Sequence, residues 1–223
     1  MLPYARSFNS YFPVFKYHDN HKLLFLEQCK AKVDVGFILD SSGSLRTEYH
    51  KEKDFLKVLA GAFDISPDGS RAGVVTFSLR AKHSIKMSDH TDAASFKAAV
   101  DAIPLMGLTT RIDRALRLTQ KELFAPANGG RADVRDVLIM LTDGTQTKSA
   151  GAEDPGDVMA EIRKTGVETI VIGIGTGTDA DELDHMAGGK GKAYSAKSFD
   201  ELIGGDFVTK LTQQTCKAGK NFL

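Results

Sequence analysis

The chain has 223 residues, of which 42% are hydrophobic and 26% are charged, and its 29 basic and 29 acidic side chains give a formal net charge of zero. This composition is that of a folded globular protein and excludes a disordered, collagen-like or low-complexity chain. The balanced charge argues against nucleic-acid binding, and no apolar run approaches the roughly 18 residues that a transmembrane segment needs.

The first 28 residues differ from the rest, because aromatic side chains crowd a stretch without helical or strand periodicity. The compact apolar run at residues 23–26 is short, and Glu27 follows it where a signal peptide would have small residues. We therefore expect residues 1–28 to be a loosely ordered extension with no evident signal peptide. The alternative is a peptide that binds a partner or touches a membrane.

From Lys32 onward, two kinds of segment alternate. Short runs rich in Val and Ile predict strands at residues 33–39, 72–77, 137–141 and 167–174, with shorter strands at 83–87 and 193–195. Apolar residues at helical spacing predict helices within residues 49–63, 96–103, 112–123, 158–162, 183–187 and 199–211.

This alternation predicts the class of fold. Strands that are apolar throughout are covered on both faces, which is typical of a mostly parallel sheet with helices on either side. The more polar run at residues 83–87 suits a sheet edge. The sequence therefore predicts a doubly wound α/β domain from about residue 32 to residue 216, with no repeat or linker that would divide it.

Polar residues of one chemical type follow two of the predicted strands. Asp40 ends the first strand, Ser42 and Ser44 follow at alternate positions, and Asp143 comes after residues 137–141. Ligands of such sheets bind at the carboxyl ends of the strands. Two carboxylates with several hydroxyls suit a hard cation such as Mg²⁺, Mn²⁺ or Ca²⁺, whereas the absence of His and Cys argues against zinc.

The same residues have a purely structural interpretation, because Ser and Asp are common at helix N-caps and in turns. The position of Asp40 after a buried strand, with Asp143 placed likewise after another, favours the metal site over a cap.

Together these motifs resemble the von Willebrand factor type A domain, over roughly residues 32–214. The resemblance implies that the domain occupies residues 29–216, with a tail at 217–223, and that its sheet has one antiparallel edge strand. The family carries a metal-ion-dependent adhesion site with the pattern Asp-x-Ser-x-Ser, a threonine from a middle loop and an aspartate after a later strand. The resemblance thus implies that Asp40, Ser42, Ser44 and Asp143 are ligands.

The threonine ligand has two candidates. Counting back from Ala115 and Leu116, which match the end of the family's loop pattern, assigns the ligand to Thr110. Thr109 is the alternative, because the second glycine of the family's loop is missing and the register could slip by one residue.

The resemblance implies a metal-dependent protein-binding module, in which the cation bridges the domain to an acidic residue of a partner such as collagen or another matrix protein. We expect the surface around the metal to set specificity and to include Leu45, Arg46, Leu108, Arg111, Gln146 and Lys148. The alternatives are a complement-type or other protease-regulating module that uses the same site, or an intracellular subunit of a larger machine.

The two cysteines bear on this choice. Extracellular members of the family often close the domain with a disulfide just outside it, and Cys29 and Cys216 flank the predicted core elements. The resemblance thus implies a Cys29–Cys216 disulfide and a secreted, extracellular protein, because disulfides persist in oxidising compartments. The alternative is a pair of buried, unpaired cysteines.

Enzyme classes fit the residues less well. Phosphatases of the haloacid dehalogenase type place a second aspartate where Ser42 stands, and a nucleophilic serine would need a histidine base near it. The glycines at residues 173–177 do not complete a dinucleotide-binding pattern, because Thr178 occupies the third glycine position. We therefore expect no enzymatic activity.

Overall fold

The computed structural model describes residues 29–204 and 207–217. Its strands are β1 (Val33–Asp40), β2 (Arg71–Phe77), β3 (Ala81–Ile85), β4 (Arg135–Thr142), β5 (Glu168–Ile174) and β6 (Tyr194–Ala196). Its α-helices are α1 (Tyr49–Gly61), α2 (Ala93–Asp101), α3 (Ile112–Leu118), α4 (Pro155–Lys164), α5 (Ala180–Ala187), α6 (Phe199–Gly204) and α7 (Phe207–Lys217). Short helical turns are η1 (Gly43–Thr47), the π-helical η2 (Thr119–Leu123) and η3 (Pro126–Asn128).

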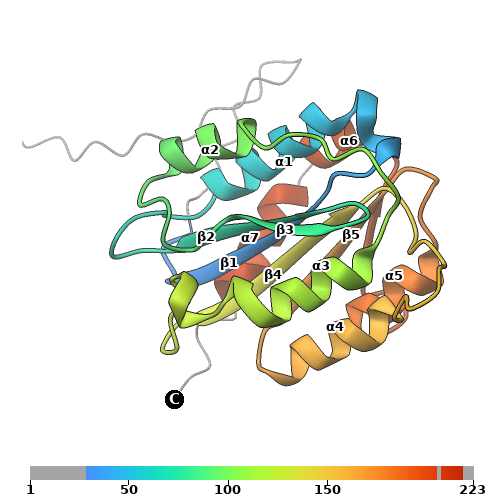
Figure 1. Ribbon diagram of the computed structural model, residues 1–223. Coiled ribbons are helices and arrows are strands. Elements are labelled where there is room, and N and C mark those ends of the chain that lie inside the picture. The colour runs from blue at the N-terminus through green and yellow to red at the C-terminus, as the bar shows by residue number, and fades with distance from the viewer. Residues whose placement is uncertain (1–28, 205–206, 218–223) are drawn as a thin grey trace, which may run out of the picture.

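The strands form one sheet in the order β3-β2-β1-β4-β5-β6, with β1 and β4 at its centre (Figure 1). All neighbours pair in parallel except β2 and β3, which pair antiparallel at one edge. The predicted α/β class, the mostly parallel sheet and the antiparallel edge strand are therefore confirmed.

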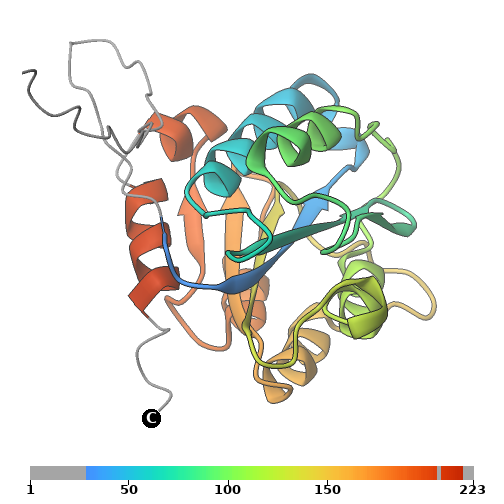
Figure 2. The ribbon, with the colours of Figure 1, turned by 90° about the vertical axis from the view of Figure 1, so that its left-hand side faces the viewer.

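Helices cover both faces of the sheet, as the view in Figure 2 shows. Helices α1, α2, α6 and α7 pack on one face in a core cluster that includes Val35, Phe37 and Ile139. Helices α3, α4 and α5 pack on the other face, against Ile38 and Leu138. Because side chains alternate along a strand, each of the central strands contributes to both clusters, which explains why their sequences are apolar throughout.

Some element boundaries differ from the prediction. The helix expected over residues 199–211 is two helices, α6 and α7, between which residues 205–206 lie outside the described part of the chain. Helix α5 begins earlier than residue 183, because the Asp179 side chain caps it by accepting hydrogen bonds from the backbone N–H groups of Asp181 and Glu182.

A disulfide joins the segment before β1 to the last described helix. Cys29, before β1, is bonded to Cys216 within α7, with a Cα–Cα distance of 5.7 Å. The predicted bond is therefore confirmed, although Cys216 lies inside the last helix and not after it. The extension expected at residues 1–28 and the tail from residue 218 lie outside the described residues. Within the described part, no helix is long and apolar enough to cross a membrane.

Candidate metal centre

The sheet brings the two predicted carboxylate ligands to one edge. β1 and β4 are parallel neighbours, with Leu39 opposite Leu141, so both strands end at the same side of the sheet (Figure 1). Asp40 is the last residue of β1, and Asp143 follows the last residue of β4. The turns after these two strands therefore form the candidate site.

The Asp40 carboxylate is buried and held at both oxygens. Its Oδ1 accepts a hydrogen bond from the backbone N–H of Ser42 over 2.9 Å, and its Oδ2 accepts one from the Thr142 hydroxyl over 2.7 Å. Burial raises the pKa of Asp40 to about 6, despite the opposing effect of these hydrogen bonds. Burial also raises the pKa of Asp143.

The two serine hydroxyls connect these carboxylates. The Oγ atoms of Ser42 and Ser44 are 3.0 Å apart, and Ser44 donates a hydrogen bond to Oδ1 of Asp143 over 2.9 Å. Oxygen ligands placed octahedrally at 2.0–2.1 Å from Mg²⁺ lie about 3 Å from one another. The spacing of these oxygens therefore fits a small hard cation. The positive charge of such a cation would offset the free-energy cost of burying the ionised carboxylates.

Thr110 lies beside the turn that carries Asp143. Its Oγ1 is 3.6 Å from the position that a Cβ on Gly144 would take. Its backbone is joined to Thr147, whose N–H donates to the Thr110 carbonyl over 2.8 Å and whose hydroxyl accepts from the Thr110 N–H over 3.2 Å. Thr109 is exposed. The structure thus places Thr110 beside the turn that carries Asp143, and its assignment as a ligand stays a prediction.

Ser41 holds the loop of residues 106–110, which carries Thr110, in place. The sequence alone did not predict this role. The Ser41 hydroxyl accepts a hydrogen bond from the Met106 N–H over 2.7 Å, and its carbonyl accepts one from the Gly107 N–H over 2.8 Å. Gly43 lies so close to this loop that an added Cβ would be 3.2 Å from the Gly107 carbonyl oxygen. A short polar residue and a glycine inside the motif are therefore both needed to seat the loop.

Glu52 on α1 is a second missed residue, because in the sequence it looks like one more charged position on a helix. It is fully buried, and its Oε1 accepts a hydrogen bond from the backbone N–H of Asp40 over 3.0 Å. Its Oε2 has no hydrogen-bond partner among the described residues. Burial raises the pKa of Glu52 well above its usual range. Glu52 therefore supports the Asp40 turn from inside the domain.

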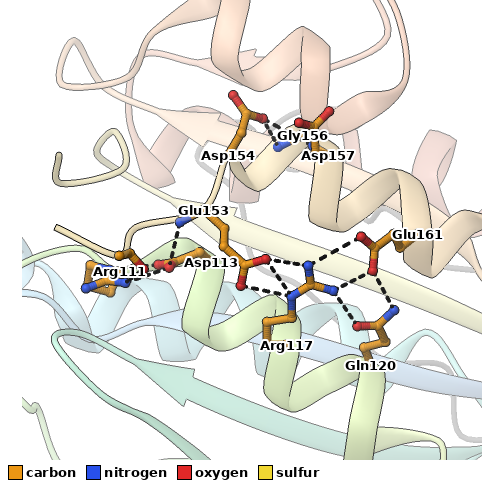
Figure 3. A network of polar contacts seen from close by, with 10 residues as sticks. Arg111, Asp113, Arg117, Gln120, Glu153, Asp154, Gly156, Asp157 and Glu161 are labelled. Carbon is orange, nitrogen blue, oxygen red and sulfur yellow. Dashed lines mark hydrogen bonds and ion pairs between the residues drawn. The ribbon is translucent and has the colours of Figure 1, made fainter. Parts of the chain in front are cut away.

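Arg111, Asp113 and Gln146 form a buried group of polar contacts between the segment after Thr110 and the loop after β4. The Arg111 guanidinium donates two hydrogen bonds to the Asp113 carboxylate, of 2.8 and 2.6 Å (Figure 3). Gln146 donates another to Asp113 over 2.7 Å. Burial raises the pKa of Asp113, but the hydrogen bonds from Arg111 and Gln146 outweigh it and lower the pKa to about 2.

The predicted specificity surface is only partly exposed. Arg46, Leu108 and Lys148 lie at the surface, and Leu108 is a large apolar side chain with 56% exposure. The prediction of surface positions is wrong for Leu45, Arg111 and Gln146, which are buried. Leu45 packs into the core, and the other two are buried because Asp113 satisfies their polar groups.

Comparisons with known proteins agree with this geometry. The profile of the von Willebrand factor type A domain matches residues 34–210. The human collagen alpha-6(VI) chain is 31% identical over 178 residues, which cover 79% of this chain and 8% of the collagen. Human matrilin-1 is 31% identical over 153 residues, which cover 66% of this chain and 30% of matrilin-1. The chain thus spans less than a third of either relative.

Solved structures are similar as well. Proximal thread matrix protein 1 from the mussel byssus, in its second crystal form, superposes with a TM-score of 0.77 at 27% identity, covering 85% of this chain and 49% of that chain. Another structure of the same protein, at a TM-score of 0.75 and 29% identity, covers 85% of this chain and 47% of that chain and has a zinc-occupied adhesion-site motif. The adhesion-site motif of that neighbour thus holds a divalent cation.

Proposed function

Because the chain belongs to the von Willebrand factor type A domain family, we propose that it is a protein-binding module that holds a divalent cation. The proposed ligands are Asp40, Ser42 and Ser44 at and after the end of β1, Asp143 after β4, and Thr110 in the loop before α3. The observation that carries the proposal is the run of oxygen contacts of 2.9–3.0 Å from Ser42 through Ser44 to Asp143.

The chain's own residues prepare the site. Thr142 and the Ser42 backbone fix the orientation of the Asp40 carboxylate, and Ser41 seats the loop that presents Thr110. When bound, the cation supplies an electrophilic position for an outside carboxylate oxygen, because two carboxylates and neutral hydroxyls leave it coordinatively unsaturated. A partner would therefore bind through an acidic side chain.

We propose Mg²⁺ as the physiological cation, with Mn²⁺ or Ca²⁺ as substitutes, since all ligands are oxygens. The partner is an extracellular matrix protein, such as a collagen, and the chain acts in binding and not in catalysis. This proposal is supported by the collagen VI and matrilin-1 relatives and by the Cys29–Cys216 disulfide, which fits a secreted protein better than an intracellular subunit. The exposed Arg46, Leu108 and Lys148 would contact the partner around the metal.

The test is a binding assay with the full chain immobilised and a solubilised collagen-rich matrix extract as the probe. Binding should disappear in EDTA and return on addition of Mg²⁺. An Asp143→Ala bait should capture nothing in Mg²⁺, whereas an Asp133→Ala bait, altered at an exposed residue, should behave like the parent protein. Equal capture by the Asp143→Ala bait, or capture that persists in EDTA, would refute the metal-dependent role.

A further inference from the structure

Two carboxylates and one imidazole meet where the start of α4 lies beside α5. Asp154 precedes α4 and Asp157 lies in its first turn, whereas His185 lies in the last turn of α5. The three side chains offer one ligand atom each, and these atoms all lie within 4.8 Å of one another. We call these three residues the α4–α5 cluster. None of them belongs to the ligand set proposed for the metal centre after β1 and β4.

The ligand atoms of the α4–α5 cluster are both accessible and close together. The side chains of Asp154, Asp157 and His185 are 54%, 77% and 53% exposed. Nδ1 of His185 is 3.2 Å from Oδ1 of Asp154, and Nε2 is 3.6 Å from Oδ1 of Asp157. Two ligands of a tetrahedral zinc ion lie about 3.3 Å apart, because each is about 2.0–2.1 Å from the metal. An ion from solvent can therefore reach these atoms, and small rotations of exposed side chains would place them around it.

Gly156 lets the imidazole lie against the first turn of α4. A Cβ at Gly156 would be 2.2 Å from Nδ1 of His185 and 2.3 Å from its Cγ, so any larger residue would displace the ring. Asp154 is held by its role as the N-cap. Its Oδ1 accepts hydrogen bonds from the Gly156 N–H over 2.8 Å and from the Asp157 N–H over 3.1 Å, and its Oδ2 takes part in neither (Figure 3). Two of the three ligands are thus in place before any ion binds.

The charge of the α4–α5 cluster favours a cation. Among the described residues, no lysine or arginine forms an ion pair with Asp154 or Asp157, and the group near both is His185. A neutral imidazole leaves both carboxylates uncompensated, and a divalent ion would balance their two charges. A protonated imidazole would instead pair with both aspartates and join α4 to α5 without a metal. These two states exclude each other, so experiment can separate them.

The donor set selects the class of ion. Mg²⁺ and Ca²⁺ take oxygen ligands, whereas imidazole is a good ligand for zinc and other first-row transition ions. One histidine and two carboxylates leave a tetrahedral zinc ion one open position, which water or a donor from outside can occupy. The α4–α5 cluster therefore differs in its chemistry from the metal centre after β1 and β4, whose proposed ligands are all oxygens.

We propose that the α4–α5 cluster binds Zn²⁺, through one imidazole nitrogen of His185 and one carboxylate oxygen each of Asp154 and Asp157. The ion joins the start of α4 to the end of α5 and presents its open position to solvent. This site does not depend on the function proposed for the other metal centre, because the two share no ligand.

The test is a titration of the full chain with ZnCl₂ at pH 7.5, in the parent protein and in Asp143→Ala. The Asp143→Ala variant lacks a proposed ligand of the other metal centre, so zinc bound at that centre does not obscure the result. In NMR spectra of both proteins, Zn²⁺ should shift the backbone amide signals of residues 156–158 and 184–186 and the imidazole signals of His185. MgCl₂ and CaCl₂ at the same concentrations should leave these signals unchanged.

Variants that keep the fold test each contribution. His185→Gln and Asp157→Asn should each weaken zinc binding at these signals about tenfold or more, because even the loss of a group that only orients a ligand costs about that much. Gly156→Ala keeps all three ligands but should also weaken binding, because its Cβ displaces the His185 ring. Asp181→Asn, at an exposed position of α5 outside the cluster, should bind zinc like the parent protein. Circular dichroism and melting curves establish that each variant is folded.

Three results would overturn the proposal. The first is no zinc-dependent shift at residues 156–158 and 184–186, which would leave the cluster as an ion-paired contact between two helices. The second is an unchanged zinc affinity at these signals in His185→Gln, which would mean that the imidazole is not a ligand. The third is a zinc response that the parent protein shows and Asp143→Ala lacks, which would assign the bound zinc to the other metal centre.

Discussion

The Ser44 hydroxyl donates a hydrogen bond to Oδ1 of Asp143 over 2.9 Å, across 99 positions of the sequence. This contact joins the turn after β1 to the turn after β4, next to the hydrogen bond from the Thr142 hydroxyl to Oδ2 of Asp40. Both residues carry oxygen atoms that a cation would bind in common. A metal at this site would therefore hold together two distant parts of the chain in the folded state only.

From this follows a prediction about metal and stability. A cation that binds only the folded protein raises the free energy of unfolding by about 2.7 kcal/mol at a hundredfold excess over Kd. For a domain of this size, that corresponds to a Tm higher by roughly 5–10 °C. We expect this increase with Mg²⁺ or Mn²⁺ in differential scanning calorimetry of the parent protein, and its loss in Asp143→Ala and in Ser42→Ala. An equal increase in both variants would refute the ligand assignment.

Thr110 and Thr109 give a prediction that tests the register of the middle loop. Thr110 lies beside Gly144 and is joined to Thr147, whereas Thr109 is exposed. Thr110→Val, which keeps the shape and removes the hydroxyl, should weaken metal binding about tenfold or more, and Thr109→Val should change it less than twofold. Isothermal titration calorimetry with Mn²⁺ measures both. A larger effect of Thr109→Val would mean that the ligand position is off by one residue.

Glu52 gives a prediction about support from inside the domain. Its Oε1 accepts from the Asp40 N–H, and Glu52→Gln keeps a carbonyl oxygen at that position whereas Glu52→Leu removes it. Loss of a partner that orients a metal ligand typically costs about tenfold or more in metal affinity. We therefore expect Glu52→Leu to bind Mn²⁺ about tenfold more weakly than Glu52→Gln. Equal affinity of the two folded variants would show that Glu52 does not orient Asp40.

Much of the fold and the site could be predicted from local sequence patterns. Asp40, Ser42 and Ser44 lie within five residues after an apolar strand, and the parallel sheet then dictates that Asp143 meets them. Sequence periodicity also shows which strands are covered on both faces. These features depend on neighbouring residues and on general rules of parallel sheets, so they need no knowledge of long-range contacts.

The errors have a common physical origin. Arg111 and Gln146 are polar residues in loops, which are usually exposed, but contacts distant in the sequence bury them. Gln146 donates to Asp113, and Arg111 donates to the Ser149 hydroxyl and the Gly151 carbonyl in the loop after β4. The burial of Glu52 depends in the same way on the Asp40 N–H. Long-range polar pairing was therefore the information that the sequence lacked.

Asp136 leads to a prediction about pH. Burial raises its pKa to about 7, with a further increase from Asp34 and a partial decrease from Arg131. Because the pKa in the folded state is above the unfolded value, the contribution of Asp136 to stability is fully present below about pH 4 and is lost as the pH rises through 7. Asp136→Asn removes this dependence. Relative to that variant, the parent protein should lose on the order of 1 kcal/mol between pH 4 and pH 8, a reduced value because Asp136 is partly exposed.

Urea unfolding at four pH values between 4 and 8 measures this difference, and Asp133→Asn serves as the control at an exposed aspartate. The control and the parent protein should give parallel curves of unfolding free energy against pH, whereas Asp136→Asn should diverge from them with increasing pH. If the curve of Asp136→Asn is also parallel to that of the parent protein, the pKa of Asp136 is not raised in the folded state.

The disulfide between Cys29 and Cys216 gives the last prediction. It joins residues 187 positions apart, so it closes a loop of almost the whole domain in the unfolded chain. In the chain-entropy model such a loop contributes up to about 5 kcal/mol, and strain in the folded state or residual structure in the unfolded state lowers that value. We expect reduction, or the double variant Cys29→Ala/Cys216→Ala, to lower the Tm of the domain in calorimetry. Agreement between the reduced protein and the variant excludes an effect specific to either treatment.

The loss of the bond should act first on α7. This helix is held by the disulfide, by packing of Val208 and Leu211 in the core, and by a hydrogen bond from Arg135 to the Thr215 carbonyl. Because the apolar packing and the Arg135 contact remain after reduction, hydrogen exchange should become faster in α7 while β1 and β4 stay protected. Faster exchange throughout the sheet would mean that the bond stabilises the whole domain cooperatively. Titration of two free thiols in the native, oxidised protein would contradict the bond itself and remove its support for an extracellular location.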